Sequence, residues 1–151
     1  MAEGAFLTKC PSCGTKNRIP AAKVAAQGRC GHCHADLPAR SFYAEAPVGV
    51  SEARFDLVTR MSPLPTLVDF WADWCAPCHA QAPVLEQLAV ELAGRLLVIK
   101  VDTQAAPMLS ARYAIRSIPT LVLMRSGIEV DRIIGAQPLP ALRARVERFL
   151  T

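Results

Sequence analysis

Six cysteines carry the most evident chemistry of this chain, and they fall into three pairs with one spacing. The pairs are Cys10/Cys13, Cys30/Cys33 and Cys75/Cys78, each with two residues between its members. Such a pair can form a redox-active dithiol, or it can supply two of the four ligands of a zinc site. The surroundings of each pair therefore decide which chemistry it serves.

The first two pairs have the spacing of a metal site. They read C-x2-C-x16-C-x2-C within a polar stretch rich in glycine, lysine and arginine, and this spacing is in the range of four-thiolate zinc sites. Gly14 and Gly31 are expected to let the backbone turn around each pair, so that N–H groups point at the sulfurs. The alternatives are two disulfides or an iron centre of rubredoxin type. His32 and His34 are not expected to bind the metal. We expect one structural, four-thiolate Zn²⁺ held by Cys10, Cys13, Cys30 and Cys33.

The third pair lies in an apolar setting that favours redox chemistry. Cys75 follows a buried strand and opens a helix, whose free N–H groups and partial positive charge stabilise a thiolate. Cys78 lies in the first helical turn, close enough to close a disulfide, and Pro77 is tolerated early in a helix. A zinc site here would need two more ligands, but this apolar part of the chain has no other cysteine and only one histidine, His79.

Alternating strands and helices are expected to position this third pair. Apolar periodicity predicts strands over 66–71, 96–101, 120–124 and 129–133, and helices over 51–60, from Cys75 to Gly94, over 107–113 and over 139–150. A strand–helix–strand order implies a parallel pair with a crossover, and the Ser126-Gly127 turn implies an antiparallel hairpin at the sheet edge. The expected fold class is α/β, with a central mixed sheet flanked by helices and preceded by a small module.

Charge and apolar content also divide the chain in two. Residues 1–44 hold six of the 17 basic residues and two of the 13 acidic ones, so this segment carries the whole net charge of +4. It has too few large apolar residues to fold without an additional cross-link, and a bound metal would provide one. The expected domains are a metal-binding module over 1–40, a linker and first strand over 41–49, and an α/β domain over 50–151.

Several stretches of the second part resemble the thioredoxin family, with similar spacing throughout. They are Val68–Cys78 (VDFWADWCAPC), Pro83, Lys100, Tyr113–Thr120 (YAIRSIPT) and Gly135-Ala136. With a zinc ribbon in front, nearly the whole chain resembles the zinc-ribbon-bearing bacterial thioredoxin-2 type. The resemblance implies a thioredoxin fold and a general protein disulfide reductase that works as a thiol–disulfide oxidoreductase.

The resemblance also implies roles for single residues. Cys75 would attack a substrate disulfide and Cys78 would resolve the mixed disulfide. Asp69 would be a buried proton acceptor, and its place inside an apolar strand independently suggests a raised pKa, while Lys100 would be its partner. Pro119 would follow a cis peptide bond and face the dithiol. The substrate would contact Trp74, Ala76, Pro77, Ile118, Pro119 and Gly135.

Two positions at the dithiol depart from the family. Ala76 stands where thioredoxins usually have glycine, and His79 stands where lysine or arginine is common. Residues between the cysteines tune the redox potential, so the sequence does not determine its value, and the starting expectation is thioredoxin's, about −270 mV. Pro77 resembles the reducing members of the family more than the strong oxidants.

The expected partners follow from this resemblance. They are disulfide-containing proteins and an NADPH-dependent flavoprotein reductase (a thioredoxin reductase) that recycles the oxidised chain, with no organic cofactor. The first residues show no signal-peptide pattern and no apolar run reaches membrane length, so we expect a cytoplasmic monomer without membrane contact.

Each part of the chain is also compatible with a second function. Within the enzyme class the alternative is an oxidase or isomerase, and outside it a zinc-dependent chaperone or binding module. The basic module could sense oxidants by releasing zinc, or bind an acidic partner. The absence of aromatic residues from 7–41 argues against nucleic acid.

Overall fold

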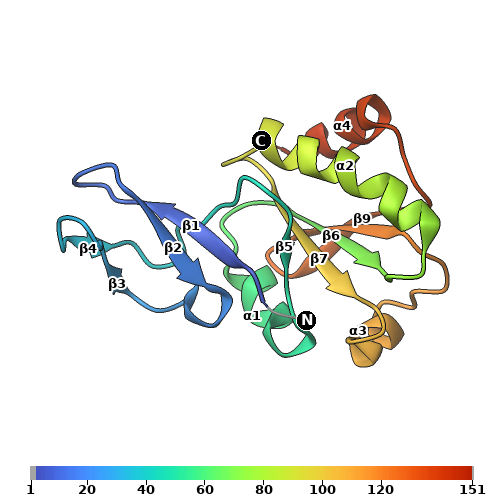
Figure 1. Cartoon of the computed structure of the whole chain (residues 1–151), viewed down its shortest axis with the longest axis horizontal. Helices are drawn as coiled ribbons and strands as arrows, with labels where there is room; N and C mark the ends of the chain where they lie inside the picture. Colours follow the sequence, from blue (N-terminus) through green and yellow to red (C-terminus); the bar gives the residue numbers. More distant parts are fainter. Residues whose placement is uncertain (1–2, 151) are drawn as a thin grey trace.

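A five-stranded mixed sheet forms the centre of the chain in the computed structural model, which describes residues 3–150 (Figure 1). Its strand order is β5-β7-β6-β8-β9. The strands are β5 (Val48–Gly49), β6 (Thr66–Trp71), β7 (Leu97–Asp102), β8 (Thr120–Arg125) and β9 (Ile128–Ile134). β6 pairs in parallel with β7 and antiparallel with β8, and β8 and β9 form a hairpin. The predicted fold class is therefore confirmed.

Helices cover both faces of this sheet. They are α1 (Glu52–Met61), α2 (Ala76–Glu91), α3 (Pro107–Arg112) and α4 (Leu139–Glu147). Val68 and Phe70 of β6 belong to the apolar cluster that includes α1 and α3, whereas Leu67 belongs to the cluster that includes α2 and α4. Because side chains alternate along a strand, Asp69 lies on the Leu67 side, the face that α2 covers.

Two helices, α2 and α4, end about a turn earlier than the sequence predicts. α2 ends at Glu91, and Gly94, with φ +83°, lies in the turn that leads to β7. The final helix ends at Glu147, because the N–H groups of Phe149 and Leu150 bond to carbonyls three residues back, at 2.9 and 3.2 Å. This tightened last turn still packs Phe149 and Leu150 against the core.

The N-terminal part forms a module of two small antiparallel hairpins. Its elements are β1 (Ala5–Lys9), β2 (Lys16–Pro20), the 3-10 helix η1 (Ala21–Lys23), β3 (Gly28–Arg29) and β4 (Asp36–Leu37). In Figure 1 it lies to the left of the sheet, and η1 contacts α1.

This module shares an apolar core with the α/β part of the chain. The rings of Phe6 and Phe42, with centroids 5.1 Å apart, belong to the same buried cluster as Phe55 of α1. Leu7 and Tyr43 exchange two backbone hydrogen bonds of 2.8 and 2.9 Å, which tie β1 to the segment before β5. The sequence predicts a module with too few apolar residues to fold alone. The structure shows that contacts with α1 supply part of the buried apolar surface that the module lacks.

Ala114 has a backbone conformation that disfavours its side chain. It lies just after α3 with φ +51°, in the left-handed region, where a residue with a Cβ is disfavoured by roughly 1–2 kcal/mol. Glycine avoids most of this strain but loses more entropy on folding, so Ala114→Gly should raise the free energy of unfolding by about 0.5–1 kcal/mol. Urea denaturation measures it. Ala111→Gly, at an exposed position within α3, is the matched control and should lower stability by a similar amount; a loss of stability in both variants would contradict the prediction.

Candidate active site and metal centre

The Cys75/Cys78 pair lies where β6 leads into α2. Cys75 is the N-cap of α2, its Sγ accepts a hydrogen bond from the N–H of Cys78 at 3.2 Å, and Pro77 lies in the first turn. The two cysteines form a disulfide with their Cα atoms 5.3 Å apart. A sulfur at a helix N-terminus receives N–H groups and the positive end of the helix dipole, so reduction would leave Cys75 in a setting that stabilises a thiolate.

A loop before β8 faces this disulfide. The Ile118–Pro119 peptide bond is cis, as the sequence analysis predicts. The carbonyl oxygen of Ile118 lies 3.6 Å from Sγ of Cys75. Gly135, with φ +91°, donates its N–H to the carbonyl of Pro119 at 2.9 Å. The structure therefore brings the predicted residues Ile118, Pro119 and Gly135 together beside the dithiol.

The surface around the dithiol is partly apolar. Trp74 is 68% exposed, Ala76 and Pro77 are exposed, and exposed large apolar side chains of this kind commonly mark contact sites. A cavity of about 270 Å³ adjoins Trp74. Its other lining residues are Thr103, Ile115, Arg116, Ser117 and Ile118. Thr103, Ile115, Arg116 and Ser117 are not among the site residues predicted from the sequence, although their places after β7 and before Pro119 could have indicated them.

Asp69 is a buried carboxylic acid on the sheet face beneath α2. It is 1% exposed, and its Oδ1 has no hydrogen-bond partner among the described residues. Burial raises the pKa of Asp69 to about 7, and the positive charge of Lys100 acts in the opposite direction. A carboxyl group with this pKa can take up and release a proton near neutral pH.

Lys100 is the neighbour of Asp69 across the parallel β6–β7 pair. Its Nζ lies 4.4 Å from the ring centroid of Trp71, a cation–π distance. Together with Ala82 and Leu85 of α2, it lines a cavity of about 230 Å³. Lys100 is thus held near the buried carboxyl group on the face where α2 packs.

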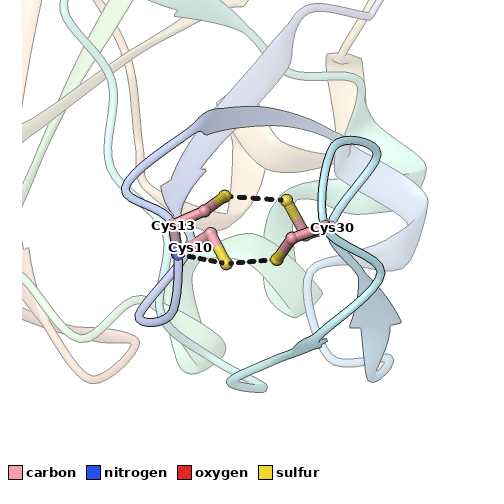
Figure 2. Close-up of side chains that lie close together, drawn as sticks. Cys10, Cys13 and Cys30 are labelled. Atoms are coloured by element: carbon pink, nitrogen blue, oxygen red, sulfur yellow. Dashed lines mark hydrogen bonds between the residues drawn. The ribbon is translucent and has the colours of Figure 1, made fainter.

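The four remaining cysteines lie close together in the N-terminal module. Their Sγ atoms all lie within 4.8 Å of one another, with Cys10–Cys33 and Cys13–Cys30 separations of 3.6 Å (Figure 2). All four are free, and His32 and His34 are not part of the cluster. Zn–S bonds of about 2.3 Å in a tetrahedron place sulfurs roughly 3.8 Å apart, so this donor set fits a zinc ion.

Backbone N–H groups surround the sulfurs. Ser12 and Cys13 donate to Sγ of Cys10 at 3.4 and 3.5 Å, and His32 donates to Sγ of Cys30 at 3.4 Å. The N–H groups of Cys33 and His32 lower the pKa of Cys30 to about 5. Such contacts favour the thiolate form that a metal requires.

The two cysteine turns are built alike, but Gly31 does not play the predicted part. Gly14 has φ +78° and donates its N–H to the carbonyl of Cys10 at 3.0 Å. The matching position in the second turn is His34, with φ +63° and the same 3.0 Å bond to Cys30. The prediction for Gly31 is wrong because the left-handed residue is the fifth of each turn, not the second.

The two sites lie at opposite ends of the molecule (Figure 1). The hairpins of the cysteine cluster lie to the left of the sheet, whereas the turn from β6 to α2 lies on the right. The cluster therefore has no direct contact with the dithiol. Among the described residues, no helix has the length and apolar character needed to cross a membrane.

Family comparisons match the two parts of the chain separately. The family described as Thioredoxin matches residues 46–148, and the zinc-ribbon family described as Thioredoxin 2, N-terminal, matches residues 9–35. The resemblance inferred from the sequence is thus confirmed.

Individual relatives are thioredoxins. Thioredoxin C-3 of Corynebacterium nephridii is 45% identical over 128 residues, which cover 84% of this chain and 83% of the relative. Thioredoxin 1 of Nostoc sp. is 40% identical over 105 residues, which cover 70% of this chain and 98% of the relative. The solved structure of a mutant thioredoxin from Halobacterium salinarum NRC-1 is similar with a TM-score of 0.66 and 34% identity, covering 71% of this chain and 93% of that one.

The fold, the dithiol at the start of α2 and these matches agree. The chain belongs to the thioredoxin family, whose members are protein disulfide oxidoreductases, and it carries an N-terminal zinc-ribbon domain of the thioredoxin 2 type.

Proposed function

We propose that the protein reduces disulfides of other proteins, with Cys75 as the attacking residue. The observation that carries this proposal is the position of Cys75, which caps α2 and faces the loop of Ile118 and Pro119. In the reduced form, the Cys75 thiolate attacks one sulfur of a substrate disulfide. A mixed disulfide forms, and the other substrate sulfur leaves as a thiolate that takes a proton from water.

Cys78 completes the reaction. Its thiol gives a proton to the carboxylate of Asp69, and the resulting thiolate attacks Sγ of Cys75. The Cys75–Cys78 disulfide forms, and the second substrate sulfur leaves and is protonated. The raised pKa of Asp69 suits it to accept this proton near neutral pH, and Lys100 keeps that pKa from rising further.

The substrate chain would bind across the surface beside the dithiol. The exposed Trp74 and the neighbouring 270 Å³ cavity offer apolar contact area, and the carbonyl of Ile118, 3.6 Å from Sγ of Cys75, offers a hydrogen-bond acceptor. The proposed substrate-binding residues are Trp74, Ala76, Pro77, Ile118, Pro119 and Gly135.

One Zn²⁺ would occupy the four-thiolate site of the ribbon. Four thiolates leave no open coordination position, so the metal would stabilise structure and take no part in disulfide exchange. The proposed domains are the zinc ribbon over 1–40, a linker with the first strand over 41–49 and the thioredoxin domain over 50–151; residues 1, 2 and 151 lie outside the described residues.

The proposed setting is the reducing cytoplasm, with the protein as a monomer. Oxidised protein would be recycled by an NADPH-dependent thioredoxin reductase, which returns two electrons to the Cys75–Cys78 disulfide. This cycle needs no organic cofactor on the chain itself.

The direct test couples the protein to NADPH, a thioredoxin reductase and insulin. We expect NADPH oxidation that depends on this protein and on insulin, and a reduction potential near about −270 mV in glutathione redox buffers. A potential near about −120 mV together with failure to reduce insulin would instead identify a disulfide oxidase.

Loss of the zinc site should unfold the ribbon and weaken the whole chain. We expect the wild type to hold about one equivalent of zinc by elemental analysis, and Cys13→Ser with Cys33→Ser to hold none. Because the ribbon shares a core with α1, the double variant should also lose about 3 kcal/mol or more in free energy of unfolding. Cys75→Ser, also a cysteine-to-serine change, is the control that should keep its zinc. Full zinc content in the double variant would contradict the four-thiolate assignment.

A further inference from the structure

Gln81 is a buried polar residue on the face of α2 that otherwise packs apolar side chains. It lies three residues after Cys78 and is 1% exposed, and Leu85 and Leu88 follow it along the buried face. Burying an amide group costs free energy unless its polar atoms are hydrogen-bonded. The partners of this amide therefore indicate why a polar residue stands here.

Both polar atoms of the Gln81 side chain bond to the backbone of one residue, Gln137. Nε2 donates to the Gln137 carbonyl at 3.1 Å, and Oε1 accepts from the Gln137 N–H at 2.6 Å. The side chain thereby pairs with both backbone groups of Gln137, as an adjacent strand would, and holds the loop between β9 and α4. Because both bonds are to the backbone, they hold this loop whatever side chain stands at position 137.

This loop borders the proposed substrate site. Its first residue, Gly135, donates to the carbonyl of Pro119 at 2.9 Å, and the carbonyl of Ile118 lies 3.6 Å from Sγ of Cys75. The dithiol thus contacts the loop of Ile118 and Pro119, and that loop contacts the loop that begins at Gly135. Gln81 connects this second loop back to α2, the helix that bears the dithiol.

We propose that Gln81 is a positioning residue for protein substrates, a role that rests on the proposed disulfide reduction. It holds Gly135 next to Pro119, so that the two loops beside the dithiol are already ordered when a substrate chain arrives. Loops that are ordered in advance reduce the entropy cost of binding. A small disulfide that contacts only Cys75 does not use these loops, so the two kinds of substrate should respond differently.

Gln81→Leu tests this by removing both hydrogen bonds while keeping a side chain of similar size. In stopped-flow measurements, the pre-reduced variant should react about tenfold more slowly than wild type with insulin disulfides, and within about twofold of wild type with 5,5′-dithiobis(2-nitrobenzoic acid). Hydrogen exchange should show faster exchange at the Gln137 and Gly135 N–H groups. Gln87→Leu, the same change at an exposed position of α2, is the matched control and should behave as wild type in all three measurements.

Two results would overturn the proposal. Equal slowing with both disulfides would mean that Gln81 only supports the helix that bears the dithiol, and unchanged rates with both would mean that the loop needs no anchor. If Gln81→Leu does not fold, Gln81→Met allows the same comparison with a more flexible apolar side chain. Failure of the wild type to reduce insulin would refute the proposed function itself, an outcome distinct from any result with the Gln81 variants.

Discussion

Cys75→Ser is expected to abolish protein disulfide reduction, whereas Cys78→Ser is expected to stop the reaction at the mixed disulfide. The two residues are equally buried, at 3% exposed each, so exposure does not decide which one attacks. Position does: Cys75 caps α2, receives the N–H of Cys78 at 3.2 Å and faces the carbonyl of Ile118. A serine hydroxyl at position 75 is a far weaker nucleophile than a thiolate, so the loss should be about a thousandfold or more.

Insulin reduction and mass spectrometry separate these two outcomes. Cys75→Ser should show no insulin reduction above background, while retaining zinc and a native far-UV circular dichroism spectrum. Cys78→Ser should accumulate a covalent adduct with a disulfide-containing peptide, released by dithiothreitol. An adduct that forms on Cys75→Ser and not on Cys78→Ser would reverse the assigned roles of the two residues.

Local sequence features predict much of the fold and the position of the dithiol. The apolar run from Thr66 to Trp71 has to be buried on both faces, and the structure places it at the centre of the sheet between β7 and β8. Cys75 follows it after a turn of three residues, so the strand–turn–helix order is enough to set the sulfur at a helix N-terminus. Pro119 is different, since most X–Pro bonds are trans, and its cis geometry could be expected only from the family resemblance.

Features that depend on tertiary contacts could not be predicted in the same way. Gly31 and Gly14 both follow a cysteine closely, yet the left-handed position of the second turn falls on His34, because the two turns superpose by position and not by residue type. The docking of the ribbon on the α1 side depends on Phe6 and Phe42, which are 36 positions apart in the chain and give no periodic signal.

Gln81 shows the same limit at the candidate site. On helical spacing it looks like an interruption of the apolar face of α2, and its partner Gln137 lies 56 residues later in the chain. Only the fold brings the two together. Polar residues at apolar positions near a predicted site are therefore the places where a sequence should be searched for such anchors.

Asp69→Asn is expected to make the protein more stable at neutral and alkaline pH. In wild type, the pKa of Asp69 is about 7 in the folded chain against 3.8 for the same group when solvated. Between these values the folded state binds more protons than the unfolded state, so the free energy of unfolding falls as pH rises toward the folded pKa and levels off above it. The full loss amounts to about 4 kcal/mol, at roughly 1.4 kcal/mol for each unit of pKa difference. Asparagine cannot ionise and escapes this loss.

Urea denaturation of Asp69→Asn and wild type between pH 5.5 and 9 measures the effect. The variant's advantage should grow by about 2 kcal/mol from pH 5.5 to 8 and then level off. Asp73→Asn, the same change at an exposed aspartate, should follow wild type across this range. A difference independent of pH would mean that Asp69 is not protonated in the folded state below neutrality, and its assignment as the proton acceptor for Cys78 would then be wrong.

A buried carboxyl group that destabilises the fold is tolerable if that group is needed for catalysis. The Asp69→Asn variant that gains stability should therefore resolve mixed disulfides more slowly.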